Sequence, residues 1–68
     1  MNDSGKQSGI PCRLIGEDGN IFNLVGLAIR SLKLGGRADL VEPLKQEVFA
    51  SKSYEEALEH IAEYVRVE

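Results

Sequence analysis

The chain has one histidine, His60, which stands among glutamates in a segment with helical periodicity. Glu56, His60 and Glu63 follow one another at spacings of four and three residues, so they lie on one side of a helix. Metal centres of helical bundles combine carboxylates with histidine, but they draw their ligands from several helices. One imidazole with the carboxylates of a single helix is a poor isolated site. We therefore interpret the segment as an acidic, solvated helix face and predict no metal ligand.

The single thiol of the chain, Cys12, could act as a nucleophile with His60 as its base. Catalysis would also need a group that orients the base and donors for an oxyanion, and neither is evident in the sequence. A small buried strand residue is the simpler interpretation of Cys12. The sequence predicts that the protein is not an enzyme and that it has no catalytic residue.

A glycine-containing loop, residues 16–20 (Gly-Glu-Asp-Gly-Asn), directly precedes an apolar segment. Free amides in such a loop can bind an anion. This loop lacks the Gly-Lys-Ser/Thr ending of phosphate-binding loops, and its own Glu17 and Asp18 would repel phosphate. We predict a tight turn that ends in Asn20 as the N-cap of a helix, and no cofactor.

Two leucines of the helix predicted after this loop are the most informative residues for function. Leu27 and Leu34 are seven residues apart and fall opposite the main apolar face, with Asn23 and Arg30 beside them. This second stripe either packs on another helix of the domain or is exposed and binds a partner helix or a second copy. The candidate partner-binding residues are therefore Asn23, Leu27, Arg30 and Leu34.

Apolar residues recur at helical spacing in three segments. The first predicts a helix over residues 21–34, closed by Gly35 and Gly36. Its predicted core face consists of Ile21, Phe22, Leu24, Val25, Ala28, Ile29 and Leu32. The second predicts a helix from residue 38 or 39 to residue 50, with Asp39 as a candidate N-cap and Phe49 off its apolar stripe, where it could anchor the connection to the next helix. The third follows Ser53, which forms a capping box with Glu56, and ends near residue 63 or 64.

Short strands are predicted on both sides of the helices, over residues 12–15 and 64–67. The second of these segments could also continue the last helix, but we favour a strand that pairs with the first and turns Val65 and Val67 toward the core. Residues 1–11 are predicted to be a disordered tail and residues 12–68 a single small helical domain. The predicted fold class is α+β, mostly helical, with the order β-α-α-α-β, three short helices and a minimal two-stranded sheet.

Composition limits the classes of protein that remain. The chain has 68 residues and a formal charge of −3, and this length predicts a single domain. Its one cysteine excludes an internal disulfide and a zinc site built from cysteine pairs. No apolar run approaches the roughly 20 residues that cross a bilayer, and the start of the chain lacks a signal-peptide core and a myristoylation glycine. We therefore expect a cytoplasmic protein without a membrane partner.

Charge is distributed unevenly along the chain. Residues 21–37 carry three basic and no acidic residues, whereas residues 51–68 carry two basic and five acidic ones. The charges of these two segments either pair with each other or are solvated by water. The basic segment could also bind an acidic protein or nucleic acid. The first two helices around Gly35 and Gly36 suggest a helix-turn-helix, but Asp39 and Glu42 of the second would oppose phosphate. Nucleic acid is therefore the less favoured partner.

Motifs at both ends of the domain resemble those of a known family. Residues 13–22 combine a short apolar strand with Gly-x-Asp-Gly-Asn, an apolar residue and Phe, and residues 64–68 read Tyr-Val-Arg-Val-Glu. Together with Tyr54-x-x-Ala57-Leu58 in the last helix, this pattern resembles a family of small bacterial and phage-associated proteins. The match covers most of the predicted domain, although residues 36–50 are not distinctive. The family has no assigned biochemical role, so the resemblance implies a fold and carries over no catalytic residue.

These observations favour a non-enzymatic protein-interaction module that uses a helical surface to bind another protein or a second copy of itself. The alternative is a small DNA-binding regulator of the helix-turn-helix type. A third and weaker hypothesis is a binder of a metal ion or small ligand.

Overall fold

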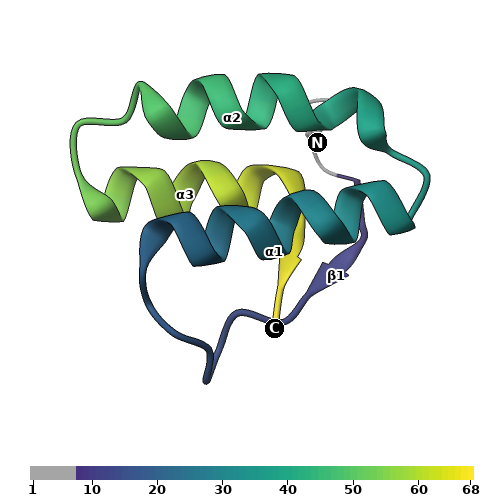
Figure 1. Ribbon diagram of the computed structural model, residues 1–68, viewed down its shortest axis with the longest axis horizontal. Helices are drawn as coiled ribbons and strands as arrows, with labels where there is room; N and C mark the ends of the chain where they lie inside the picture. Colours follow the sequence, from purple (N-terminus) through teal and green to yellow (C-terminus); the bar gives the residue numbers. More distant parts are fainter. Residues whose placement is uncertain (1–7) are drawn as a thin grey trace.

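The computed structural model describes residues 8–68, so residues 1–7 of the predicted tail lie outside the described part. The elements are β1 (Pro11–Cys12), α1 (Ile21–Leu34), a 3-10 turn η1 (Ala38–Leu40), α2 (Val41–Phe49), α3 (Tyr54–Tyr64) and β2 (Arg66–Val67). The three α-helices lie alongside one another, and the two strands lie together below α1 and α3 in the view of Figure 1. The predicted mostly helical α+β fold with the order β-α-α-α-β is confirmed.

The sheet joins the two ends of the described chain. β1 and β2 pair in parallel, with Pro11 opposite Arg66 and Cys12 opposite Val67. β1 is shorter than predicted because the turn that leads to α1 begins at Ile15, and Gly16 in this turn adopts a φ of 90°. β2 is shorter than predicted because α3 continues to Tyr64. The amides of Leu14 and Ile15 nevertheless donate to the carbonyl of Glu68, at 2.8 and 2.9 Å. Pairing therefore continues beyond the strands themselves.

The residues just before β1 are attached to α3 and β2. The amide and hydroxyl of Ser8 donate to the carbonyl of Tyr64 at 3.0 and 2.7 Å, and the carbonyl of Ile10 accepts from the amide of Arg66 at 2.9 Å. The side chain of Ile10 packs against the core. Residues 8–11, which we had assigned to the tail, thus hold defined positions.

The core lies between the three helices and the end of β1, where Cys12 and Leu14 are buried. Its buried members on α1 are Leu24, Val25, Ala28 and Leu32, all of which belong to the predicted core face. Those on the other helices are Val41, Leu44, Val48, Ala57, Ile61 and Tyr64. The prediction was wrong for Phe22, which stays 69 % exposed because it lies at the edge of the apolar arc in the first turn of α1. Val65 is buried as predicted, whereas Val67 keeps 38 % of its surface exposed.

Local signals in the sequence fix the helix ends. The side chain of Asn20 accepts from the amide of Phe22 at 2.8 Å, which confirms the predicted N-cap of α1. Gly36, with a φ of 79°, closes α1 in a Schellman motif, in which the amide of Arg37 donates to the carbonyl of Leu32 at 2.8 Å. Ser53 caps α3 by accepting from the amide of Glu56 at 3.0 Å. The side chain of Glu56 reaches back to the amide of Lys52, one residue before the cap.

The second helix begins differently from the prediction. Asp39 lies inside the 3-10 turn η1 and caps nothing; its carboxylate accepts two hydrogen bonds from the guanidinium of Arg37, both of 3.1 Å. Pro43 accounts for the difference, because a proline ring clashes with the carbonyl four residues earlier and offers it no amide hydrogen. That carbonyl belongs to Asp39, so the regular α-helix starts only at Val41.

Candidate functional site

The four predicted partner-binding residues do not share one exposed apolar face. Leu27 is half-buried and packs against the core, as the first of our two interpretations states. Asn23 donates its side-chain amide to the carbonyl of Asp18 at 3.0 Å and so holds the loop before α1. Arg30 and Leu34 are exposed, and Leu34 keeps 78 % of its surface. A single exposed leucine at the end of α1 is a small surface for a partner.

A larger apolar surface lies where α1 begins and where α2 connects to α3. Phe22, Phe49 and Tyr54 keep 69, 58 and 47 % of their surface exposed, and the rings of Phe22 and Phe49 lie 6.1 Å apart with a tilt of 40°. The three side chains border a hollow of about 330 Å³. We call this hollow the aromatic hollow; its other lining residues are Ile21, Val48, Ser51, Lys52, Ser53 and Ala57.

Helix ends position the three rings. Phe22 lies in the first turn of α1 because Asn20 caps that helix, and Tyr54 is the first residue of α3 because Ser53 caps it. Phe49 is the last residue of α2. The hydroxyl of Tyr54 donates to the carbonyl of Gly19, which ties the start of α3 to the loop before α1.

Hydrophobic periodicity predicts Phe22 in the core and Phe49 as an anchor of the connection, whereas both rings are exposed and border this hollow. A usable signal was present in the sequence. Phe22, Phe49 and Tyr54 are three of the four aromatic residues of the chain, and each stands at a predicted helix end, where fewer neighbouring turns can cover a side chain.

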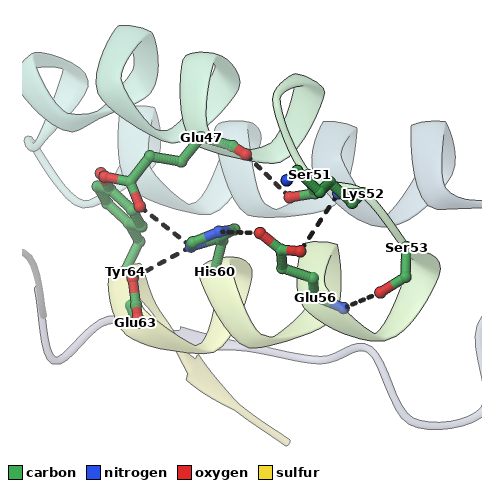
Figure 2. A network of polar contacts seen from close by, with 8 residues as sticks. All are labelled: Glu47, Ser51, Lys52, Ser53, Glu56, His60, Glu63 and Tyr64. Atoms are coloured by element: carbon green, nitrogen blue, oxygen red, sulfur yellow. Dashed lines mark hydrogen bonds and ion pairs between the residues drawn. The ribbon is translucent and has the colours of Figure 1, made fainter.

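A group of polar side chains gathers between α2 and α3 (Figure 2). The Nδ1 atom of His60 lies 3.1 Å from Oε1 of Glu47 and 3.4 Å from Oε1 of Glu63. Its Nε2 atom lies 3.6 Å from Oε2 of Glu56. We call these four residues the His60 cluster. The predicted proximity of Glu56, His60 and Glu63 is confirmed, but Glu47 was missed because a contact between two helices leaves no spacing signal.

The surroundings of His60 and Tyr64 shift their proton affinities. Burial lowers the pKa of His60, but Glu63, Glu47 and Glu56 together raise it more, so the pKa lies above its ordinary value. Burial and the carboxylate of Glu47 both raise the pKa of Tyr64. Tyr64 is 1 % exposed, and its protonated hydroxyl donates to Oε2 of Glu47 at 2.6 Å. Glu47 is therefore held from one side by a buried tyrosine while its other oxygen faces His60.

The two remaining candidates from the sequence are the thiol of Cys12 and the helix-turn-helix segment, and the structure supports a functional role for neither. Cys12 is a buried thiol in β1, in agreement with its interpretation as a strand residue. Asp39 of the segment that would act as a DNA-recognition helix pairs with Arg37 directly before it, and Lys45 within the segment pairs with Glu42 at 3.2 Å. These positive charges are engaged by acids of the same segment, which weakens the helix-turn-helix alternative.

Comparisons of the chain with protein-family models, with curated proteins and with solved structures find no match in any of the three. The resemblance to small bacterial and phage-associated proteins therefore stays a prediction. No helix among the described residues has both the length and the apolar character needed to cross a membrane.

Proposed function

We propose that the protein is a small, non-enzymatic protein-interaction module and that the aromatic hollow is its docking surface. The observation that carries this proposal is the exposure of Phe22, Phe49 and Tyr54 around one hollow. Aromatic side chains are enriched where proteins bind one another, and a contiguous apolar patch on a small domain marks such a site. The three rings are exposed to water in the isolated protein, and a bound partner would bury them.

The form of the hollow suggests what enters it. Its volume of about 330 Å³ is small, and its three rings keep between 47 and 69 % of their surface exposed. Small-molecule sites bury most of their ligand, so an open hollow fits an anchor side chain of a larger partner better. Lys52 lies at the rim, and its ammonium group forms no ion pair within residues 8–68. The expected occupant is a large apolar side chain with an acidic residue next to it.

This surface replaces the one predicted from the sequence. Leu34 is exposed but isolated, since Leu27 packs against the core. The class of function, an interaction module that uses a helical surface, is unchanged. The proposed surface moves from the outer side of α1 to its first turn and to the connection between α2 and α3.

Selection from a library of short random peptides tests the proposal. Immobilised full-length protein is the target, and each bound pool is then compared on the variants Phe49→Ser and Leu34→Ser. Both substitutions replace an exposed apolar side chain with serine, so they are matched in chemistry and differ in location. Circular dichroism verifies that each variant keeps its helices.

We expect selected peptides to share an aromatic residue or leucine beside Asp or Glu, to lose binding to Phe49→Ser and to keep binding to Leu34→Ser. A Lys52→Glu variant should disfavour the acidic position of the consensus. Peptides that bind Phe49→Ser as well as the parent protein would refute the hollow as the docking surface. Loss of binding to Leu34→Ser alone would return the site to the outer side of α1. Light scattering on the parent protein gives the remaining outcome: a dimer abolished by Phe49→Ser would make a second copy the partner.

A further inference from the structure

We propose that Glu47, His60 and Glu63 bind one Zn²⁺ ion between α2 and α3, at a site separate from the aromatic hollow. The inference does not depend on the proposed docking function. The sequence predicts no metal site here, because Glu56, His60 and Glu63 all lie on one helix. Glu47 supplies a ligand from a second helix, which removes that objection.

The donor atoms lie at separations that suit one ion. One ligand atom from each of the three residues lies within 4.8 Å of the other two, and Nδ1 of His60 is 3.1 and 3.4 Å from the two carboxylate oxygens. Zinc–nitrogen and zinc–oxygen bonds measure about 2.1 Å, so two ligands of one ion are about 3.0–3.4 Å apart. The two separations from Nδ1 of His60 match this range, and the two carboxylate oxygens lie within 4.8 Å of each other. Glu63 is 46 % exposed, so its side chain has room to adjust to an ion.

Neighbouring groups hold two of the ligands in place. The buried hydroxyl of Tyr64 donates to Oε2 of Glu47 at 2.6 Å and leaves Oε1 turned toward His60 (Figure 2). Glu56 approaches Nε2 of His60 from the opposite side, at 3.6 Å. Histidine ligands commonly donate their second ring N–H to a carboxylate, which fixes the tautomer that presents the other nitrogen to the metal. Glu56 is placed for that role when Nδ1 coordinates the ion.

The ligand types select the class of ion. Imidazole together with carboxylates suits Zn²⁺ and its transition-metal neighbours, whereas Ca²⁺ and Mg²⁺ prefer sites made only of oxygen. Glu47, Glu56 and Glu63 place three carboxylates around one imidazole, a mixed set of oxygen and nitrogen donors of the kind that zinc sites use. Three protein ligands leave the fourth position of a tetrahedral ion to water.

Titration of the untagged full-length chain with zinc chloride tests the site. Isothermal titration calorimetry gives the stoichiometry and affinity, and long-range ¹H–¹⁵N correlation spectra of His60 show which ring nitrogen coordinates. We expect one equivalent of Zn²⁺ to bind through Nδ1 and expect excess Mg²⁺ to leave it bound. Lower pH should weaken binding because protons compete for the same nitrogen.

Four variants separate this site from general attraction to acidic residues. His60→Gln and Glu63→Gln should each weaken Zn²⁺ binding by more than about tenfold, and Tyr64→Phe by about tenfold, since groups that orient ligands contribute 10–100-fold to affinity. Glu59→Gln removes an exposed glutamate of the same helix that is outside the cluster, and it should leave the affinity unchanged. Circular dichroism checks that each variant is folded. If Tyr64→Phe does not fold, the result for Glu63→Gln decides the test.

Equal affinity in Glu63→Gln and Glu59→Gln would overturn the proposal, because it would indicate diffuse binding to the acidic face. So would His60 spectra that do not change with zinc, since the network would then bind protons only. Retained Zn²⁺ affinity in His60→Gln combined with loss in Cys12→Ser would assign the ion to the thiol and also refute the site. None of these results bears on the aromatic hollow, because none of the three ligands lines it.

Discussion

Two ends of the molecule differ in how far they bury their apolar side chains. The sheet end, around β1 and β2, buries them, whereas the aromatic end, around the aromatic hollow, leaves them exposed. At the sheet end, Cys12, Leu14 and Val65 have exposed fractions of 2, 9 and 0 %, and the backbone between the two strands is hydrogen-bonded from Ser8 to Glu68. At the aromatic end, where α1 starts and α2 connects to α3 (left in Figure 1), Phe22 and Phe49 stay more than half exposed.

This difference separates stability from binding. A domain of this size buries only about 60 % of the surface of its unfolded chain, so its core has few side chains to spare. Here the buried positions are filled almost entirely by aliphatic residues, while three of the four aromatic rings remain in reach of water. Apolar area left exposed by folding is what a partner can still remove from water. The buried core, which includes the sheet end, should therefore determine the free energy of unfolding, and the aromatic end the affinity for a partner.

Truncating one buried and one exposed side chain tests this separation with the largest expected effect. Ile61→Ala removes a side chain that is 0 % exposed and should lower the free energy of unfolding by about 2–5 kcal/mol, since it leaves a cavity. Phe49→Ala, at 58 % exposed, should lower it by less than about 1 kcal/mol. Urea unfolding followed by circular dichroism measures both. A loss at Phe49 as large as that at Ile61 would mean that the hollow is part of the core.

Two glycines of the helical region give a second contrast, of smaller size and opposite sign. A Cβ atom on Gly35 would lie 2.9 Å from Cγ1 of Ile10 and closer still to its Cδ1, so the contact that fastens residues 8–10 to α1 must shift. Gly35→Ala should therefore destabilise the fold by about 1–3 kcal/mol. Gly26 is exposed within α1 and has open space at its Cβ position, so Gly26→Ala should stabilise it by about 0.5–1 kcal/mol.

Thermal unfolding of the two variants beside the parent protein measures these shifts. The pair is matched because both add one methyl group to the α1 region. A Gly35→Ala variant as stable as the parent protein would show that Ile10 is loosely held and that the sheet end is less tightly closed than its hydrogen bonds indicate.

The parts of the fold that could be predicted from the sequence depend on neighbours in the chain. Asn20 and Ser53 cap helices by bonding to amides two and three residues ahead, and Gly36 closes α1 through its own backbone conformation. Hydrophobic periodicity placed Leu24 and Ala28 in the core for the same reason. The late start of α2 does not follow from hydrophobic periodicity, because it depends on the clash of Pro43 with the carbonyl of Asp39, four residues earlier.

The parts of the candidate sites that could not be predicted depend on contacts between helices. Periodicity places Phe22 beside the core face but does not tell whether another helix reaches far enough to cover it. Glu47 and His60 are 13 positions apart, and only the packing of α2 on α3 brings their side chains to 3.1 Å. For the same reason, the sequence does not decide whether Leu27 packs on another helix or is exposed, and only the structure shows its contact with the core.

The N-cap of α3 allows a finer test of the aromatic end. Ser53→Ala removes the acceptor for the amide of Glu56 and should lower the free energy of unfolding by about 1 kcal/mol. Because Tyr54 directly follows this cap, the same variant should also weaken peptide binding at the hollow. Ser31→Ala, at a half-buried helix position without a capping role, is the control and should change neither quantity appreciably. Weaker stability with unchanged peptide binding would show that the cap does not position Tyr54.

The smallest expected effect is the pH dependence contributed by His60. Its pKa in the folded protein lies above the ordinary value of 6.5, so the native state binds this proton more tightly than the unfolded chain does. The resulting stabilisation is fully present below about pH 6.5 and is lost as pH rises through the raised pKa of the folded state. His60→Gln should therefore approach the parent protein in free energy of unfolding as pH increases across this interval. The change should stay below about 1 kcal/mol, since partly exposed ion pairs are screened by solvent.

Urea titrations in chelator-containing buffer keep zinc from contributing, and Glu59→Gln serves as the control with a pH-independent difference. A difference between parent and His60→Gln that grows with pH would have the wrong sign and would show that burial, not the three glutamates, dominates the proton affinity of His60.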